Sequence, residues 1–341
     1  MRTRKKYGGD ILACTIKDIA VACGVSEGTV DRALNNRKGI SDKTKAKVLE
    51  VAKAMNYEPN HLARCLATGS TKTIGVVCAS ITSNFFSTLV ESIEYRAREK
   101  GYFINLIISR GDKERELEGV HYMINRKVDG LIIFPAKKGD DYVKEFKKLN
   151  VPIITIYNRI SEEFTHVDVD CRTIMRNAVK MINRKGYDRV MYVDFYRSSY
   201  RKDNNSFSID ERIAGYKEAI SKLNMDEIIY NEKQGEDIVE KILSCKEKGI
   251  KIAILCVNDM VAIKMLNLFR TRGLSVPQDV GIMGFDNIDM LNVIIPKINS
   301  VDCHIRNIGK TAVDMLILKM NGEKDLEDVV LDYSFTEGDT L

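Results

Sequence analysis

Residues 15–35 read TIKDIAVACGVSEGTVDRALN, a stretch that fits two short helices joined by a tight turn. Thr15 can cap the first helix, Gly24 can end it in the left-handed conformation, and Ser26 can cap the second. Apolar side chains recur at helical spacing in both halves, namely Ile16, Ile19, Ala20 and Cys23, then Val30, Ala33 and Leu34. This pattern predicts a helix-turn-helix.

A third helix is predicted over residues 41–56, with an inner face of Ala46, Val48, Leu49, Ala52 and Met55. Three helices in so short a segment form a small core, and generic three-helix packing explains the apolar pattern equally well. The second helix, however, has a polar face suited to base edges and phosphates, made by Ser26, Glu27, Thr29, Arg32 and Asn35. We therefore expect residues 15–59 to form a DNA-binding domain.

The positive charge of the 341-residue chain is concentrated near its start. Residues 1–70 carry 13 Lys and Arg against seven Asp and Glu, whereas residues 71–341 have a net charge of −1. This asymmetry is expected of a nucleic-acid-binding head on a nearly neutral body, although a solvated basic tail has the same composition. Residues 1–14 contain four of these bases and are either a disordered extension or an arm that contacts phosphates.

Residues 60–69 predict a short helix between the head and the body. Pro59 ends the preceding helix, Asn60 can cap a new one, and Gly69 ends it after about two turns. A helix of this length is marginal in water, so it should form only when it is docked against something. We interpret the segment as a hinge helix.

The head is similar to one known family. The run over residues 15–35, with GIS at 39–41, NYEPN at 56–60 and ARCLATG at 63–69, closely resembles the lactose-repressor (LacI/GalR) family of transcription regulators. The resemblance implies a homodimer on a pseudo-palindromic operator in double-stranded DNA, with recognition helices in two major grooves and hinge helices in the minor groove. The DNA-contacting residues that it implies are Thr15, Ser26, Glu27, Gly28, Thr29, Arg32, Asn35, Asn60, Ala63 and Leu66.

Three of these residues have specific roles under the resemblance. Leu66 matches the leucine that wedges into the central base step, where bent DNA gains contacts that offset the cost of unstacking. Its alternative role is burial against the next domain. Glu27 and Gly28 match the two main base-reading positions. Glu27 can accept a hydrogen bond from cytosine N4 or can simply be solvated, and Gly28 has no side chain with which to read a base.

The remainder of the chain, residues 73–341, alternates apolar strands with amphipathic helices. Strands are predicted over residues 73–78, 102–108, 130–134, 152–157, 189–193, 252–257 and 280–284. Continuous apolar strands of this kind are typical of parallel sheets covered on both faces. The segment is too long for one such sheet, so the fold class we expect is α/β, with an all-α head and a two-lobed core of doubly wound parallel sheets. We place the N-lobe at about 73–170 and 303–328, and the C-lobe at about 171–302 and 329–341.

Polar and aromatic side chains follow several of these strands, where ligands bind in doubly wound folds. The candidates are Asn84, Phe85, Phe86, Arg159, Asp170, Arg212, Asn258 and Asp286. Aromatic rings stack on the apolar faces of a sugar, while carboxylate, amide and guanidinium groups bind its hydroxyls. The set therefore fits a neutral sugar or polyol better than a phosphorylated base.

The body also looks like the periplasmic sugar-binding-protein fold that this family joins to its DNA-binding head. Under that resemblance the candidates match sugar-binding positions, Asp170 being one used in the repressors. Arg212 and Asp286 stand in the family-like sequences DERxxGY and GFDN. Phe85 and Phe86 can instead be core residues, and we expect Asp168 and Asp259 to be helix caps rather than ligand contacts.

Sequence motifs of catalysis and of metal binding are missing. The chain has no GxGxxG, no phosphate loop, no GxSxG and no HExxH, and none of its four His lies beside a plausible nucleophile. The eight cysteines are scattered singly, which argues against zinc. We therefore expect no enzyme activity, no metal and no cofactor.

The first residues, MRTRKK, have no apolar stretch behind them, and no apolar run approaches the roughly 20 residues of a membrane helix. We expect a cytoplasmic protein without a membrane partner. The leading interpretation is a transcriptional repressor whose operator affinity changes when a small sugar or polyol binds between the two lobes. A sugar-binding or sensor protein without operator control and a ligand-dependent activator remain as alternatives.

Overall fold

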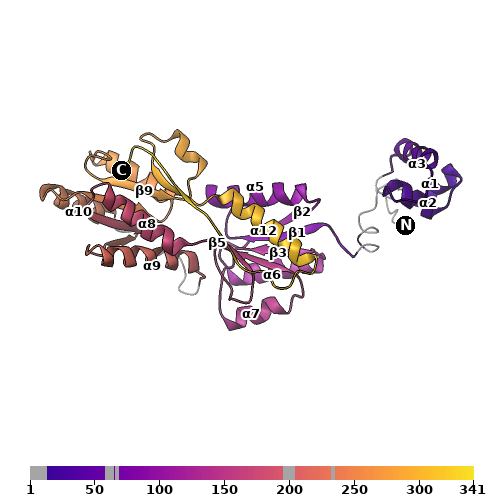
Figure 1. Ribbon diagram of the computed structural model, residues 1–341, viewed down its shortest axis with the longest axis horizontal. Coiled ribbons are helices and arrows are strands. Elements are labelled where there is room, and N and C mark those ends of the chain that lie inside the picture. The colour runs from indigo at the N-terminus through magenta and orange to yellow at the C-terminus, as the bar shows by residue number, and fades with distance from the viewer. Residues whose placement is uncertain (1–13, 58–64, 66–68, 195–203, 232–234) are drawn as a thin grey trace, which may run out of the picture. The chain divides into compact units, whose positions relative to one another are not determined.

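The computed structural model describes residues 14–57, 65, 69–194, 204–231 and 235–341, in two compact units, Met1–Thr71 and Lys72–Leu341 (Figure 1). Most of the predicted hinge at 60–69 lies outside the described residues. Three of the expected DNA contacts, Asn60, Ala63 and Leu66, fall in that undescribed part.

The first unit has helices α1 (Ile16–Cys23), α2 (Glu27–Leu34) and α3 (Asp42–Ala54). Each begins at the predicted cap, because the hydroxyl oxygens of Thr15, Ser26 and Ser41 accept hydrogen bonds from backbone N–H groups one turn further on. Gly24 ends α1 at φ 69°, in the left-handed region. The predicted helix-turn-helix is confirmed, and its core consists of Ile19, Ala20, Cys23, Val30, Ala33, Val48 and Ala52.

One detail of the predicted head is wrong. Leu49 and Met55 were expected on the inner face of α3, but they are 43% and 37% exposed. Val48 and Ala52, four residues apart, are the buried side chains of this helix. The inward stripe of α3 is therefore narrower than its apolar residues suggested.

The first lobe of the second unit is built on a six-stranded parallel sheet in the order β11-β5-β4-β3-β1-β2. Its strands are β1 (Thr73–Cys78), β2 (Phe103–Ile108), β3 (Gly130–Ile133), β4 (Ile153–Ile156), β5 (His166–Val169) and β11 (Val329–Leu331). Its helices are α5 (Asn84–Glu99), α6 (Lys113–Asn125), α7 (Asp140–Lys147) and α12 (Ile305–Met320).

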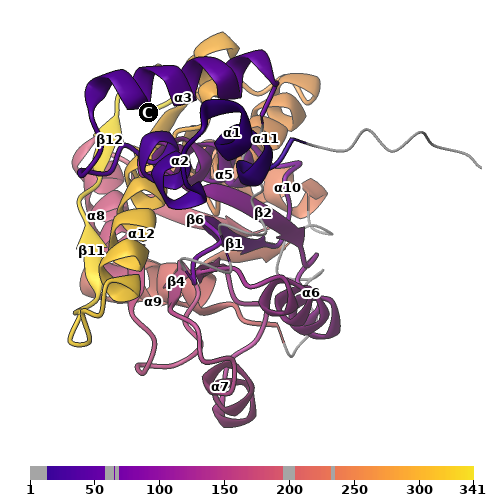
Figure 2. The same cartoon turned by 90° about the vertical axis from the view of Figure 1, so that its right-hand side faces the viewer.

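Both faces of this sheet are buried, as the continuous apolar strands predicted. Val76 and Ile132 belong to a core with α5 and α12, whereas the adjacent Val77 and Ile133 belong to one with α6 and α7. Helices α5 and α12 pack on each other and lie over one face, while α6 and α7 lie over the other (Figures 1 and 2). The close α5–α12 contact depends on Gly309, where an added Cβ would lie 3.0 Å from the carbonyl oxygen of Leu89.

The second lobe repeats this plan with a six-stranded sheet in the order β12-β10-β9-β8-β6-β7. Its strands are β6 (Arg189–Asp194), β7 (Ile229–Asn231), β8 (Ile252–Cys256), β9 (Gly281–Phe285), β10 (Asn299–Asp302) and β12 (Ser334–Thr336), the last antiparallel to β10. Its helices are α8 (Cys171–Arg184), α9 (Phe207–Lys222), α10 (Gly235–Glu247) and α11 (Asp259–Thr271), with a 3-10 helix at Asp289–Val293. The predicted α/β fold class is confirmed.

One expected lobe boundary needs correction. Residues 329–341 were placed in the second lobe, but Val329–Leu331 forms β11 and pairs in parallel with Val167–Val169 of β5. The pairing satisfies the backbone groups on the open edge of β5, which explains why the chain joins the first sheet before it crosses over. The chain crosses from the first lobe to the second after β11, since Ser334–Thr336 pairs with β10. None of the helices in the described part of the chain is long and apolar enough to cross a membrane.

Candidate functional site

The exposed face of α2 is the candidate nucleic-acid interface in the first unit. Glu27, Gly28 and Arg32 are exposed, and Thr29 is half-buried. Gly28 faces open space, because an added Cβ would approach nothing closer than the Ser26 hydroxyl oxygen at 3.9 Å. The packing of the unit therefore does not require glycine at position 28, which leaves that position free to be set by an external partner.

Some of the polar groups expected to contact DNA already have roles within the unit. The Thr15 and Ser26 hydroxyls cap their helices, and Thr29 Oγ1 lies 2.9 Å from Ser26 Oγ. The Asn35 amide donates to Asp31 Oδ1 at 2.8 Å, and Arg37 pairs with the same carboxylate at 3.1 Å. These bonds fix the two ends of α2. Glu27, the first residue of α2, and Arg32 are exposed and make none of these bonds.

A cleft of about 1110 Å³ lies in the second unit, at the carboxyl ends of strands from both lobes. The first lobe contributes residues that follow β1, β2, β3 and β4, and the second contributes the start of α9 and the residues after β8 and β9. Six of the predicted ligand residues line it: Asn84, Phe85, Phe86, Arg212, Asn258 and Asp286. This is the edge at which doubly wound sheets bind ligands.

Arg212 and Asp286 form a charged pair at this cleft. Arg212 Nη2 lies 3.7 Å from Asp286 Oδ1, and both residues are only 6% exposed. The guanidinium also donates to the carbonyl oxygen of Val257 at 2.5 Å and lies 3.6 Å from the ring centre of Phe285. Burial raises the pKa of the Asp286 carboxyl to about 7, although the charge of Arg212 opposes this rise.

Two polar atoms of this pair remain unsatisfied. Arg212 Nε and Asp286 Oδ1 are buried and have no hydrogen-bond partner among the described residues. Leaving a charged group's hydrogen-bonding atom buried and unpaired is costly, so such atoms are candidates for bonds to a ligand. The pair thus offers one donor and one acceptor, which together match the dual character of a hydroxyl group.

The neighbouring polar residues also hold elements of the fold in place. Asn258 Oδ1 accepts the backbone N–H of Val261 at 3.0 Å and so caps α11. Asp259 accepts from the Ser300 hydroxyl at 2.6 Å and from the backbone N–H of Ile288 at 2.8 Å. It ties the residues after β9 to α11. Asp259 is thus a structural carboxylate, as expected, but the residue that caps the helix is Asn258.

Aromatic rings form one wall of the cleft. The ring centres of Phe85 and Phe86 are 5.0 Å apart, Phe85 is 4.7 Å from Tyr157, and Phe86 is 4.9 Å from Phe134. All four line the cleft and pack edge to face, so the two phenylalanines pack against the core, as the alternative held, and also face the space where a ligand would bind. The hydroxyl of Tyr157 is buried without a hydrogen-bond partner among the described residues.

Hydrogen bonds join the two lobes beside the cleft. Asn205, just before α9, donates from its backbone N–H to Ala136 O at 2.8 Å and from Nδ2 to the carbonyl oxygens of Lys137 and Arg159, at 3.1 and 2.7 Å. Asn158 in turn donates to Asn205 O at 2.8 Å. Asn205 is 3% exposed, so this bridge is shielded from water. No pattern in the sequence points to this bridge, because residue 205 lies in an irregular segment.

Two predicted ligand residues lie away from the cleft. Arg159 pairs with Asp328 at 2.7 Å and with Glu162 at 2.9 Å. Tyr157 has φ 57°, which turns the chain at the end of β4 so that Asn158 lines the cleft and Arg159 does not. Asp170 is exposed and caps α8, accepting the N–H of Thr173 at 2.9 Å. We remove Arg159 and Asp170 from the ligand set.

Metal chemistry finds no support in the described part of the chain. No group of three or more His, Cys, Asp or Glu there could hold a metal ion. Six of the eight cysteines are buried and all eight are free thiols. In the core, His166 Nε2 lies 3.4 Å from Asp168 Oδ2, and the other ring nitrogen, Nδ1, lies 2.9 Å from Thr155 Oγ1. Both ring nitrogens of this buried histidine therefore have protein partners.

The fold defines a helix-turn-helix protein with a two-lobed body that contains a cleft, and comparison with known proteins identifies the family. Residues 15–60 match the model of the bacterial regulatory proteins of the lacI family, and residues 179–341 match that of the periplasmic binding protein-like domain. Catabolite control protein A of Priestia megaterium is 30% identical over 319 residues, which cover 91% of this chain and 93% of that protein. The chain belongs to the lacI family of bacterial transcription regulators.

Solved structures share the fold. The lac repressor dimer bound to operator and the anti-inducer ONPF has a TM-score of 0.81 at 24% identity and covers 96% of this chain and 99% of its own. A LacI family transcriptional regulator from Enterococcus faecium with bound ribose has a TM-score of 0.66 at 24% identity, covering 79% and 98%. The relatives found are transcription regulators and not enzymes.

Proposed function

We propose that the protein is a repressor that binds operator DNA as a homodimer and is controlled by a small sugar or polyol in the cleft. The observation that carries the ligand half of this proposal is the buried pair Arg212 and Asp286, with one unsatisfied donor atom and one unsatisfied acceptor atom. A neutral hydroxyl can satisfy both atoms without adding a buried charge. The aromatic wall supplies the apolar surface against which a sugar ring stacks.

The proposed ligand contacts are the cleft residues Asn84, Phe85, Phe86, Tyr157, Arg212, Asn258 and Asp286. A protein of the same fold was solved with bound ribose, which supports a sugar as the class of ligand. Because the cleft lies between lobes that Asn205 bridges, ligand binding would change the free energy of lobe closure.

The DNA half of the proposal rests on the family and on the exposed face of α2. We propose Glu27, Gly28 and Arg32 as base or phosphate contacts, with Thr15, Ser26, Thr29 and Asn35 around them and Asn60, Ala63 and Leu66 in the hinge. The operator-bound lac repressor dimer supports a dimer on a two-fold symmetric site. Such a protein works where the DNA is, in the cytoplasm, without catalysis, metal or cofactor.

A calorimetric titration of the full chain with a panel of monosaccharides and polyols tests the ligand half. We expect at least one of them to bind, and Arg212→Lys to weaken that binding by roughly tenfold or more, because a single ammonium cannot replace the forked guanidinium. Arg176→Lys, on α8 and outside the cleft, is the matched control. If no compound binds, or if both variants bind like the parent, the proposed ligand site is wrong.

A further inference from the structure

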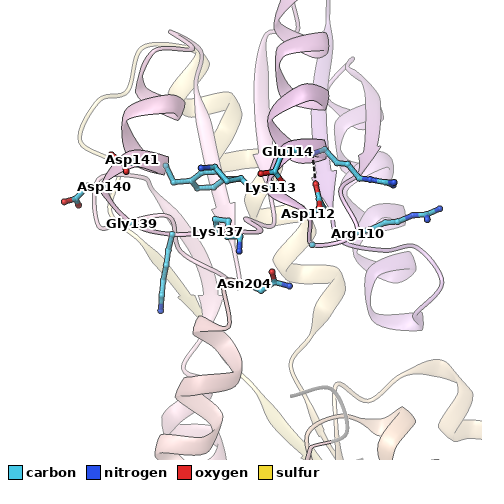
Figure 3. A pocket seen from close by; sticks show the side chains of 13 residues that line it. Arg110, Asp112, Lys113, Glu114, Lys137, Gly139, Asp140, Asp141 and Asn204 are labelled. Carbon is cyan, nitrogen blue, oxygen red and sulfur yellow. Dashed lines mark hydrogen bonds between the residues drawn. The ribbon is translucent and has the colours of Figure 1, made fainter. Parts of the chain in front are cut away.

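A second cavity, of about 770 Å³, adjoins the cleft in the first lobe (Figure 3). It lies between the residues that follow β2 and β3, at the beginnings of α6 and α7. Arg110, Gly111, Arg115 and Asn204 line both this cavity and the cleft, so the two spaces share a border. Gly111 lies at this border with φ 68°, in the left-handed region that favours glycine.

Basic side chains around the cavity lack acidic partners. Five line it: Arg110, Lys113, Arg115, Lys137 and Lys138. None of the five forms an ion pair with any residue that the structure describes. Lys113 lies 5.8 Å from the ring centre of Tyr142 and also interacts electrostatically with Glu145, outside the cavity, so it is the least available of the five. In Figure 3 Lys137 lies in the middle of the cavity, directed toward Asn204.

The carboxylates near the cavity are engaged or lie at its margin. Asp112 accepts the backbone N–H of Arg115 at 3.0 Å and caps α6. Asp141 pairs with Lys144 at 3.3 Å. Asp140 and Asp141 lie on the far side of the start of α7 from Asn204 (Figure 3), and Glu114 is exposed. The cavity is therefore lined by five basic groups and four carboxylates, and the carboxylates lie away from Lys137 and Asn204 or are held by other bonds.

The wall of the cavity is held rigid by a buried glutamate. Glu116 is fully buried, accepts the backbone N–H of Ala136 at 2.9 Å and accepts the Tyr142 hydroxyl. These bonds connect α6, α7 and the segment after β3, which carries Lys137. A binding group held in this way loses little entropy when a ligand arrives.

We propose that this cavity binds the phosphate group of a phosphorylated small molecule, with Lys137 and Arg110 as its principal contacts. A phosphate has three acceptor oxygens for the ammonium of Lys137, the fork of Arg110 and the amide of Asn204. The inference goes beyond the sugar-binding proposal, since the phosphate could belong to the molecule in the cleft or to a separate one.

Ribose 5-phosphate, ribose and inorganic phosphate are suitable probes for calorimetry on the full chain at constant ionic strength. We expect ribose 5-phosphate or inorganic phosphate to bind. Arg110→Gln with Lys137→Gln should weaken that binding by roughly tenfold or more, whereas Lys148→Gln, on the exposed surface, should not. Absence of binding by both phosphate probes, or equal affinities in all variants, would overturn the proposal.

The variant Asp286→Asn distinguishes a phosphate attached to the molecule in the cleft from a phosphate on a separate molecule. It also distinguishes failure of the phosphate proposal from failure of the sugar proposal. If the phosphate is attached to the molecule in the cleft, ribose 5-phosphate should bind more tightly than ribose and should be weakened by Asp286→Asn as well. If it belongs to a separate molecule, inorganic phosphate should bind equally to the parent and to Asp286→Asn. Phosphate binding that depends on Lys137 while no sugar binding depends on Asp286 would support this site and refute the sugar site.

Discussion

Arg212 Nη2 lies 3.7 Å from Asp286 Oδ1, although the two residues come from helix α9 and from the end of strand β9. The contact is loose for an ion pair, and each partner keeps a buried atom without a hydrogen bond among the described residues. The Val257 carbonyl and the Phe285 ring hold the guanidinium in place. The pair is thus preorganised for a third group, which we propose to be a ligand hydroxyl.

The role of this pair is tested by Asp286→Asn, which keeps the shape of the side chain and removes its charge. A hydrogen bond to a charged acceptor contributes roughly 1.5 to 3 kcal/mol, so we expect effector affinity to fall by about tenfold or more. Calorimetry on the full chain measures the change, and Asp226→Asn on the surface is the control. Unchanged affinity in Asp286→Asn would show that the carboxylate does not contact the effector.

The bridge between the lobes is tested by Asn205→Ala. The substitution removes two bonds that Nδ2 donates across the lobes and leaves the carbonyl oxygens of Lys137 and Arg159 unpaired. We expect a loss of roughly 2 to 3 kcal/mol in the free energy of unfolding and weaker effector binding. Denaturant unfolding and calorimetry measure the two effects. Asn307→Ala, exposed on α12, should change neither, and an equally small effect of both variants would argue against the bridge.

The buried carboxyl of Glu116 makes stability depend on pH. Burial raises its pKa from an ordinary 4.5 to about 7, despite the hydrogen bonds from Tyr142 and Ala136. The native state therefore holds a proton that the unfolded chain releases between these values. The stability due to this proton is fully present below about pH 4.5 and is lost as the pH rises through 7.

Glu116→Gln should remove this dependence, because the amide is always neutral and still offers an oxygen to Ala136. Between pH 5 and pH 8 the parent should lose up to roughly 3 kcal/mol relative to the variant. The difference in denaturant midpoint between the parent and Glu116→Gln at each pH removes the contribution of the other titrating acids. Glu118→Gln, exposed on the same helix, should follow the parent. A parent and a Glu116→Gln variant with parallel pH profiles would contradict the assignment.

The close contact of α8 and α9 is tested by Gly215→Ala. An added Cβ would lie 2.1 Å from the carbonyl oxygen of Arg172, so the two helices would have to separate. Overpacking of this kind costs roughly 1 to 3 kcal/mol, which thermal or denaturant unfolding would detect. At Gly235 the nearest atom would be 3.6 Å away, and Gly235→Ala should be tolerated. Equal stability of the two variants would show that the helices are not constrained at Gly215.

Long apolar strands and capped helices could be predicted from the sequence because their signals are local. All seven strands expected from apolar runs are present, with ends that differ by at most a residue or so, as with Ile252–Cys256 for residues 252–257. The strands that were missed all have three or four residues, and they include Val329–Leu331 and Ser334–Thr336. Their place depends on which sheet edge is open, and this is a property of the assembled fold rather than of the segment.

The candidate site was predictable where a residue type and its position after a strand agreed, as at Asp286 after β9. The prediction was wrong by one residue at Arg159. Because Tyr157 has the left-handed conformation, Asn158 lines the cleft and Arg159 does not. The prediction was also wrong at Asp170, whose carboxylate caps a helix instead of lining the cleft. The Asn205 bridge depends on contacts between segments about 45 to 70 residues apart, which no local pattern records.

The central claim is that ligand binding in the cleft controls DNA binding by the same chain. The most direct measurement selects duplexes from a randomised DNA pool with the full protein and then titrates the selected operator with and without the sugar that binds best. We expect the sugar to change operator affinity by roughly 5- to 150-fold, and this change to be lost in Asp286→Asn while operator binding itself persists. An operator affinity that is the same with and without saturating sugar would contradict the account.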